Sequence, residues 1–334
     1  MNIKLYFTFC ILIIFFVSCI DNKTNNKLAK DDLYDINLDA SSSEDALFDK
    51  KLLLSDIADS IIYVPLQLTD STIIGKVSEL FLTEDRIFVF DRNLAKSLFA
   101  YSRKGDLLFQ KSRGIGGPHE IYDLQDVSID KINKIIAIYS AGYNKVFLYD
   151  YNGKLQKEIK FLEGFSDVEI IDAAHYLCYR EFQPEGINPK DSYSNYRLCY
   201  LDGEGKLLKG WYKNVRNKNI QLPTNSNFFA KRYNNTILFE GSNKDSIFSF
   251  SSRQEEVLPF MTSNLKSSKV LLTSKSYNEY NKLSANIANL TNVPIESENF
   301  ILGSYAYKTI VYSYLFNKSL VHVARQILPQ IPAG

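Results

Sequence analysis

The sequence predicts an all-β protein, a β-propeller of about six four-stranded blades preceded by a lipoprotein signal and a polar leash. Three observations support the propeller. The chain of 334 residues contains 22 Tyr and 22 Phe but only 9 Pro, and such a composition favours half-buried strands. Apolar runs, most of them five to seven residues long, recur between Asp, Asn and Gly turn signals, as short strands do. One hairpin-like segment also repeats about every 50 residues, which is typical of propeller blades.

Residues 1–18 are predicted to be a lipoprotein signal peptide. Lys4 precedes an apolar run, Leu5–Val17, which has the length of a signal sequence and is shorter than the roughly 20 residues of a membrane span. The residues Phe16-Val17-Ser18-Cys19 resemble a bacterial lipobox, although Phe stands where Leu is usual. We therefore expect lipid attachment at Cys19 and a place in the cell envelope, at the outer membrane. The alternative is an uncleaved N-terminal anchor.

Residues 19–45 are polar and are predicted to form a leash that spaces the folded domain from the bilayer. Of the four cysteines, Cys178 and Cys199 remain in the domain once Cys10 has left with the signal and Cys19 has become the anchor. Both lie in apolar, Tyr-rich stretches that resemble neighbouring strands. They could form a disulfide in an oxidising compartment, but two buried free thiols are the favoured interpretation. No Cys and His pattern indicates a zinc site.

The propeller is predicted to span residues 46–325. Its expected strands share β-branched and aromatic enrichment, and they are 60–68, 79–82, 86–91, 97–102, 106–111, 126–130, 134–139, 145–151, 154–160, 234–240, 246–251, 300–307 and 309–316. The repeated hairpin has a glycine at Gly105, Gly153 and Gly205, with spacings of 48 and 52, because a tight turn needs a positive φ. Division of 280 residues by about 50 gives five to six blades. A β-sandwich would not explain this long, fixed period.

Two segments in the C-terminal part of the chain look irregular, one inside the predicted propeller and one after it. Residues 267–290 lack clear alternation and could contain a helical or irregular insertion. The tail 326–334 contains two prolines, which cannot donate to a strand ladder. We therefore expect an incomplete last blade and an open or imperfect closure of the ring near Ser60–Leu68.

Several segments resemble the six-bladed, NHL-like β-propeller lipoproteins of Bacteroidetes. The similarity lies in Ile57–Leu66, Ile74–Val77, Asp85–Asp91, the Gly105 turn, the Gly-rich run Arg113–Glu120 and the stretch from Asp126 to Gly153. His119 stands where that family usually has Gly. The resemblance implies a six-bladed propeller on a lipid anchor and implies no catalytic residues.

Charge and motifs exclude several classes of function. Lys and Arg number 39 and Asp and Glu 38, for a net charge of +1, whereas a general nucleic-acid binder needs a basic excess. The Gly-rich run 114–120 lacks the Lys of a phosphate-binding loop and is predicted to be a turn. The three histidines, His119, His175 and His322, are far apart in sequence. No catalytic residue, metal site or cofactor is therefore predicted.

The remaining candidates are ligand contacts. His119 and Glu120 are predicted to lie exposed in the Gly-rich loop, and aromatic side chains in probable loops could stack on a sugar or hold a peptide. Core packing is the competing role for each of these aromatic residues. The candidate ligand-binding residues are His119, Glu120, Tyr122, Tyr143, Trp211 and Tyr212.

These observations predict a lipid-anchored, non-enzymatic module of the cell envelope. Its partner is expected to be a glycan, a peptide or another envelope protein, and the sequence does not choose among them. The alternative function is that of a propeller lyase or hydrolase with a metal near the axis, where His119 or His175 would meet carboxylates. A structural scaffold or a degraded copy is a third possibility.

Overall fold

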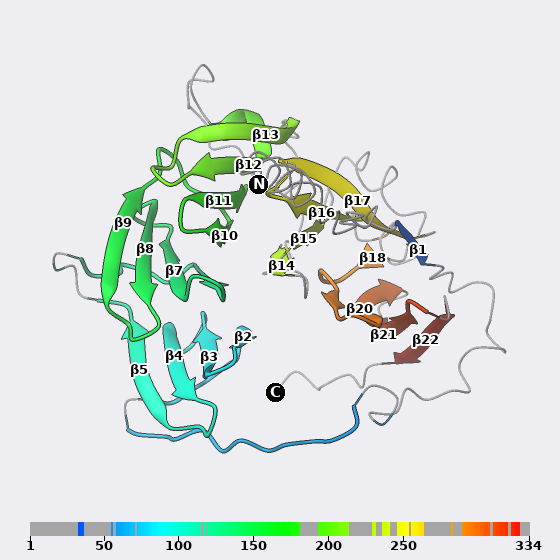
Figure 1. The fold of residues 1–334 in the computed structure, drawn as a ribbon, viewed down its shortest axis with the longest axis horizontal. Helices are drawn as coiled ribbons and strands as arrows, with labels where there is room; N and C mark the ends of the chain where they lie inside the picture. Colours follow the sequence, from blue (N-terminus) through cyan, green and yellow to red (C-terminus); the bar gives the residue numbers. More distant parts are fainter. Residues whose placement is uncertain are drawn as a thin grey trace, which may run out of the picture.

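Five antiparallel sheets, arranged as blades around one centre, make up the described part of the chain (Figure 1). The computed structural model describes residues 33–36, 58–70, 72–114, 117, 119–180, 193–213, 229–231, 236–240, 246–253, 255–263, 289–307, 310–319 and 322–327, together with Ser55 and Lys282. None of the helical residues in these ranges forms a helix long and apolar enough to cross a membrane. The fold is therefore an all-β propeller, as the sequence predicted.

Blades 1 to 3 each consist of four sequential strands, from the innermost to the outermost. Blade 1 contains β2 (Glu79–Leu82), β3 (Arg86–Asp91), β4 (Ser97–Ser102) and β5 (Leu107–Ser112). Blade 2 contains β6 (Asp126–Asp130), β7 (Ile135–Ser140), β8 (Lys145–Asp150) and β9 (Leu155–Lys160). Blade 3 contains β10 (Asp167–Asp172), β11 (His175–Tyr179), β12 (Tyr196–Asp202) and β13 (Leu207–Lys213), with a short 3-10 helix, η2 (Tyr193–Asn195), before β12.

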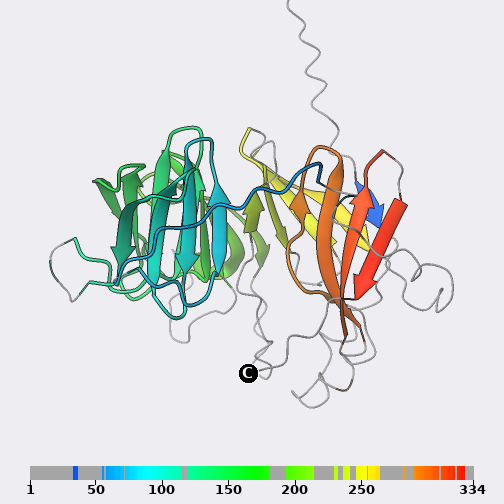
Figure 2. The same ribbon diagram turned by 90° about the horizontal axis from the view of Figure 1, so that it is seen from below.

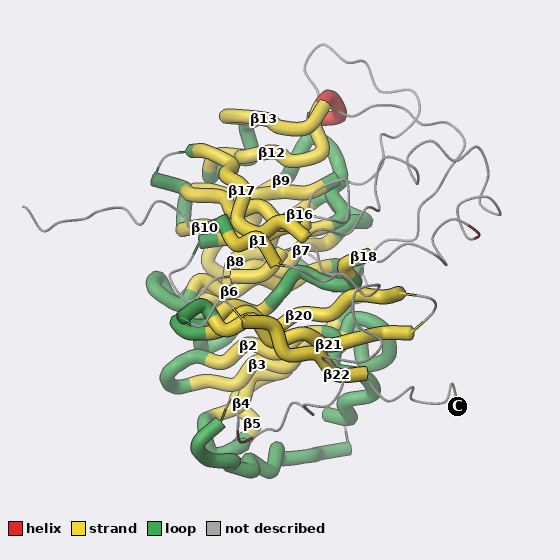
Figure 3. The backbone as a smooth tube through the Cα atoms, turned by 90° about the vertical axis from the view of Figure 1, so that its right-hand side faces the viewer, coloured by secondary structure: helices red, strands yellow, loops and turns green. Residues whose placement is uncertain are grey.

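Blades 4 and 5 depart from this plan. Blade 4 contains β14 (Phe229–Lys231), β15 (Ile237–Glu240), β16 (Ser246–Ser251) and β17 (Glu256–Ser263), and the N-terminal strand β1 (Tyr34–Ile36) adds to β17 in parallel. Blade 5 contains β20 (Phe300–Tyr307), β21 (Ile310–Asn317) and β22 (His322–Ile327), while two short strands, β18 (Asn289–Leu290) and β19 (Ile295–Glu296), share the inner edge of β20. Figure 3 shows β1 lying against β17, near the last blade.

Strict alternation along each strand builds the core between the blades. In β3, Phe88 and Phe90 point toward blade 2, where they pack with Phe147 and Ile138, whereas Ile87 and Val89 belong to a separate cluster on the other side. The same alternation recurs between blades 2 and 3, 3 and 4, and 4 and 5. Because both faces of a blade are buried, the strands read as nearly continuous apolar runs.

The repeated hairpin is the turn between the two outer strands of a blade. Gly105, Gly153 and Gly205 have φ values of 95°, 77° and 83°, so the predicted need for a positive φ is confirmed. In blades 2 and 3 an Asp begins the turn, and its side chain accepts hydrogen bonds from two backbone N–H groups of the turn. Blade 4 places Glu255, with φ 49°, 50 residues after Gly205. This substitution hid the fourth repeat in the sequence.

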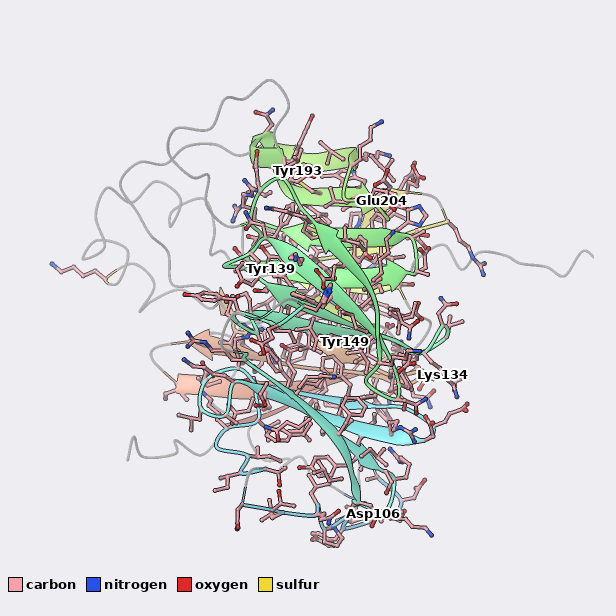
Figure 4. The ribbon with its side chains drawn as sticks, turned by 90° about the vertical axis from the view of Figure 1, so that its left-hand side faces the viewer. Asp106, Lys134, Tyr139, Tyr149, Tyr193 and Glu204 are labelled. Carbon is pink, nitrogen blue, oxygen red and sulfur yellow. The ribbon has the colours of Figure 1, made fainter. Side chains whose placement is uncertain are left out.

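The turns define two faces of the ring. The loop face carries the β3–β4 and β7–β8 turns and the connections between successive blades, including residues 113–125 and 161–166. The turn face carries the β2–β3, β6–β7 and β10–β11 turns and the repeated hairpin turns. Asp106, Lys134 and Glu204, from three turns of this second face, lie along one edge of the molecule in Figure 4.

Within the described residues, no strand bridges the gap between blades 5 and 1. An open closure of the ring near Ser60–Leu68 stays a prediction. Residues 58–69 cross this gap as an extended chain that forms no strand within the described residues (Figures 1 and 2). The segment touches blade 1 at its hairpin turn, where Gln67 donates a backbone hydrogen bond to the carbonyl of Gly105 (2.8 Å). Leu66 and Ile74 cover the cluster of Ile87, Val89, Phe99 and Tyr101. Leu66 and Ile74 therefore cap the blade 1 face, which no other sheet of the described residues covers.

Several expectations about the ends of the propeller were wrong. The described residues form five sheets, within the five to six blades expected from the length but fewer than the six that the resemblance implied, because the described part of residues 46–78 contributes no strand to a further sheet. The predicted strand 60–68 is extended but has no strand partner. The last blade is not cut short either: β22 pairs with β21 from His322 to Ile327, two residues beyond the predicted end at 325. The rest of the predicted tail lies outside the described residues.

The predicted leash also needs correction. Signal residues 1–18 and Cys19 lie outside the described residues, but Tyr34 and Ile36 of the expected leash form β1. Ile36 is fully buried, and the Tyr34 ring meets Phe260 and Phe316 edge to face, with centroids 5.4 and 5.6 Å away. Two apolar residues at alternate positions suffice to fill the crevice between blades 4 and 5, and so short a pattern is invisible in a polar stretch. The expected insertion 267–290 is described only at Lys282 and in β18.

Cys178 and Cys199 face each other in register on β11 and β12. Both are free and fully buried, in agreement with the favoured interpretation. Burial raises the pKa of both thiols, that of Cys199 to about 12, so neither forms the reactive thiolate near neutral pH.

Candidate functional site

Four of the six predicted ligand contacts come together on the loop face, over blades 1 and 2. His119, Glu120 and Tyr122 belong to the connection between β5 and β6, and Tyr143 belongs to the β7–β8 turn. The two tyrosine rings lie 5.3 Å apart, centroid to centroid, at an angle of 46°. Tyr122 is 46% exposed and Tyr143 is 37% exposed. They form a small aromatic surface open to solvent.

The chain positions these rings with one glycine and one aspartate. A Cβ on Gly142 would lie 2.5 Å from the ring of Tyr122, so only glycine allows the ring to lie across the β7–β8 turn. Asp123 accepts hydrogen bonds from the Ser140 hydroxyl and from the Gly142 backbone N–H, the latter at 3.1 Å. These bonds fasten the connection that carries Tyr122 to the turn that carries Tyr143.

Charged side chains surround the aromatic pair. The Arg113 guanidinium lies 5.3 Å from the Tyr122 ring centroid, and the Lys145 ammonium lies 5.9 Å from that of Tyr143. Lys145 also forms a salt bridge of 2.7 Å with Glu158, which His119 contacts through Nδ1. The hydrogen bond from Lys145, reinforced by His119, lowers the pKa of Glu158 against the opposing effect of burial. We call Arg113, His119, Tyr122, Tyr143, Lys145 and Glu158 the tyrosine platform.

The Gly-rich loop has the turn geometry that was predicted for it. Gly114 donates a backbone hydrogen bond to Ile121 (2.8 Å), and Gly117 donates one to the Glu120 carboxylate (2.6 Å). His119 has a φ of 64°, a left-handed conformation that favours glycine. The His119 side chain is 71% exposed.

Trp211 and Tyr212 lie apart from the platform, on β13 of blade 3. Trp211 packs edge to face against Phe250 with centroids 5.6 Å apart, and Tyr212 packs against Phe239 and Phe248 at 6.2 and 5.8 Å. Burial raises the pKa of Tyr212 to about 12. Both side chains are half-buried and join blade 3 to blade 4, which is the packing role weighed against ligand contact.

A network of acidic residues on the innermost strands was not predicted from the sequence. Glu79 and Asp126 open β2 and β6, and Arg92 joins them through Nη2, at 3.1 Å from Glu79 and 3.4 Å from Asp126. Asp126 also accepts the backbone N–H of Val168 on β10 (2.8 Å). Burial, then repulsion from Asp126, raises the pKa of Glu79 well above its usual value. The available signal was an acid at the start of the innermost strand in blades 1, 2 and 3, namely Glu79, Asp126 and Asp167.

The histidines do not converge. His119 lies on the loop face, whereas His175 lies at the β10–β11 turn of the turn face, hydrogen-bonded to Asp172 at 2.9 Å and stacked on Tyr200. The side chain of His322 lies outside the described residues. Within the described part of the chain, no three His, Cys, Asp or Glu side chains are grouped so that they could hold a metal ion.

Comparison with known proteins identifies a family and two similar structures. Residues 33–323 match the family described as a domain of unknown function, DUF4934. No curated protein matches the chain. A solved structure of a protein from Bacteroides fragilis NCTC 9343, described as exported, has a TM-score of 0.66 at 15% identity, over 80% of this chain and 75% of that chain. A DUF4221 family member from Bacteroides vulgatus has a TM-score of 0.51 at 11% identity, over 79% of this chain and 84% of that chain. At these identities the likeness concerns the fold.

Proposed function

The chain belongs to the DUF4934 family, and from this premise we propose that it is a lipid-anchored β-propeller of the bacterial cell envelope that binds a ligand on its loop face without catalysis. The observation that carries the proposal is the tyrosine platform. Residues that are 21 positions apart in sequence, Tyr122 and Tyr143, present adjacent exposed rings. Exposed aromatic rings beside fixed polar groups are typical of ligand sites.

The envelope location rests on the N-terminal sequence. A short positively charged start, an apolar run and the lipobox-like residues before Cys19 favour export and lipidation. A protein of similar fold is itself described as exported. Labelling cells with an alkyne fatty acid would test this part: the wild-type protein should take up the label and sediment with outer membranes, and Cys19→Ala should do neither. Label on Cys19→Ala would place the anchor elsewhere.

The absence of catalysis belongs to the proposal because the candidate histidines are separated. His119 and His175 lie on opposite faces of the ring and contact different carboxylates, Glu158 and Asp172. The runner-up function, a propeller lyase or hydrolase with a metal near the axis, would need such groups to share an ion. Incubation of the protein with envelope glycans and divalent metal ions should release no new reducing or unsaturated ends. Release that is lost in His175→Ala would favour the enzyme.

The ligand-binding part is tested with the purified protein on arrays of glycans and peptides and by capture from envelope extract. Tyr122→Ala and Tyr143→Ala should each weaken capture about 5-fold to 100-fold, since a stacked aromatic contact contributes roughly 1–3 kcal/mol. Tyr63→Ala is the matched control, because Tyr63 is 88% exposed on the chain that crosses the gap. Equal loss in the control, or undiminished capture by both platform variants, would refute the proposed site.

A further inference from the structure

Arg113 is the platform cation that no described carboxylate balances. It is exposed, and its guanidinium contacts the Tyr122 ring at 5.3 Å. Within the described residues it takes part in no salt bridge or side-chain hydrogen bond. Lys145, in contrast, is paired with Glu158. The other two nearby carboxylates, Asp123 and Glu120, accept hydrogen bonds from the protein's own backbone, at Gly142 and Gly117.

A guanidinium that lies over an aromatic ring can still bind an oxyanion. Its planar fork of N–H donors matches the two oxygens of a carboxylate. Lys cannot reproduce the arrangement, because an ammonium is a point donor on a flexible stem. Arg113 and the ring beneath it therefore offer one charged group and one apolar face to the same ligand.

The rest of the platform suits a sugar better than a peptide. Peptides are commonly held by main-chain hydrogen bonds to an exposed backbone edge, but three of the described backbone donors beside the platform are already used. Gly142 N–H binds Asp123, Asn144 N–H binds the Ala141 carbonyl, and Gly114 N–H binds the Ile121 carbonyl. What remains exposed is ring surface and side-chain donors. Ring surface stacks on the apolar face of a pyranose, and side-chain donors bind its substituents.

We infer that the tyrosine platform recognises an acidic glycan, in which a uronic acid residue rests on Tyr122 and Tyr143 and places its carboxylate on the edge of Arg113. This inference rests on the proposed function and names the ligand class of the same site. Three carboxylates line the region, Glu120, Asp123 and Glu158, and each is held by a donor of the protein. Because these three carboxylates are held by protein donors and Lys145 is paired with Glu158, Arg113 is the platform group that remains to pair with the ligand carboxylate.

The test compares each acidic polymer with its own neutral form. Polygalacturonate, alginate and hyaluronan are titrated by calorimetry into the purified full chain, and each is then replaced by the same polymer with its carboxyl groups reduced to alcohols. We expect the wild-type protein to bind at least one acidic polymer about 10-fold to 100-fold more tightly than its reduced form, since a charge-assisted hydrogen bond contributes about 1.5–3 kcal/mol. The preference should shrink at high salt.

Variants separate the charge from the ring. Arg113→Gln should bring the acidic polymer down to the affinity of its reduced form, and Arg113→Lys should recover only part of the difference. Tyr122→Ala should weaken both forms together. Arg103→Gln is the matched control, because it removes an exposed arginine from the β4–β5 turn on the turn face. Circular dichroism and thermal unfolding of each variant establish that the fold is retained.

The outcomes distinguish the two proposals. Equal binding of an acidic polymer and its reduced form would overturn the acidic preference and leave a glycan-binding platform. Binding of a peptide or of neutral glycans only, lost in Tyr122→Ala, would likewise overturn the inference alone. A difference that persists in Arg113→Gln would assign the charge recognition to another residue and overturn the role of Arg113. Failure to bind any glycan, peptide or envelope component would overturn both proposals.

Discussion

The two faces of blade 1 show two ways to bury the same kind of surface. Toward blade 2, Phe88 and Phe90 pack against a complete neighbouring sheet. Toward the gap, Phe99 and Tyr101 are equally buried, but their cover is an extended chain that contributes Leu66 and Ile74. A blade face therefore needs apolar cover rather than a partner sheet. This thin cover leaves apolar side chains of the segment that crosses the gap in contact with solvent. Ile62 and Tyr63 remain 82% and 88% exposed.

The largest effects should come from the interface between two sheets. Phe147 is fully buried between blades 1 and 2, and Phe147→Ala should lower the free energy of unfolding by about 3–5 kcal/mol. Leu66 is half-buried in the cap, so Leu66→Ala should cost only about 1–2 kcal/mol. Urea unfolding of both variants would measure the contrast. Equal losses would mean that the cap is as closely packed as a blade interface.

The hairpin glycines extend this comparison to the backbone. A Cβ on Gly105 would lie 1.9 Å from the Pro65 carbonyl oxygen of the capping chain, and φ is 95°. Gly105→Ala should therefore cost about 3 kcal/mol, through the strained φ and displacement of the cap. A Cβ on Gly153 would meet the Phe109 ring at 3.1 Å and Lys111 Cε at 3.3 Å, both of them side chains, so Gly153→Ala should cost about 1–2 kcal/mol. Thermal unfolding would rank them, and a larger loss at Gly153 would contradict a tight contact between cap and turn.

The pH dependence of stability should distinguish Glu79, on the innermost strand β2, from Glu158 of the tyrosine platform. Burial raises the pKa of Glu79, so its stabilising contribution is complete below the unfolded-state pKa and is lost as pH rises through the folded-state pKa. The pKa of Glu158 is lowered by Lys145, so its contribution is present at neutral pH and lost as pH falls. The free energy of unfolding is measured from pH 3 to 8. Its decrease toward higher pH should be smaller in Glu79→Gln than in the wild type. Its decrease toward lower pH should be smaller in Glu158→Gln. If Glu79→Gln instead changed the decrease at lower pH, and Glu158→Gln the decrease at higher pH, burial would not be what raises the pKa of Glu79.

The smallest effect is expected at His119. Its φ of 64° strains any residue with a Cβ, so His119→Gly should be more stable than His119→Ala by about 1 kcal/mol. Both variants lose the exposed contact with Glu158, which is worth less than about 1 kcal/mol. Differential scanning calorimetry resolves such a difference. Equal stability of the two variants would mean that the loop relaxes to an unstrained conformation.

The sequence predicts the strands of blades 1 and 2 closely because local signals agree there, whereas in blade 3 only the two Cys-containing stretches and the Gly205 hairpin were anticipated. The expected strand 86–91 has the same bounds as β3, and the three hairpin glycines mark the repeat. Length divided by period predicts five to six blades rather than one number. It counts the residues that cross the gap as part of a blade, although the described ones form no strand. The sheet of blade 4 was only partly anticipated, since Glu255 replaces glycine in its hairpin and only the energy of tertiary packing compensates for a left-handed glutamate.

The candidate site divides in the same way. Residues 119, 120, 122 and 143 gather because the connection from β5 to β6 lies beside the β7–β8 turn, as the blade repeat implies. Trp211 and Tyr212 look equally loop-like in sequence, yet they pack between blades because β13 extends to residue 213. Arg113 was passed over because its significance depends on which carboxylates lie near it. That information is three-dimensional and does not appear in residue spacing.

The position of β1 determines where an N-terminal attachment would pull on the domain. Strand β1 is clamped to β17 by three paired residues, with Ile36 fully buried, at the side of the ring across from blades 1 and 2 (Figure 1). A force applied to the chain before β1 would therefore act on blades 4 and 5. The tyrosine platform lies on the opposite side of the ring. Residues 20–33 can span at most about 48 Å when extended. With the lipid anchor proposed at Cys19, this length would limit the distance between the membrane and β1.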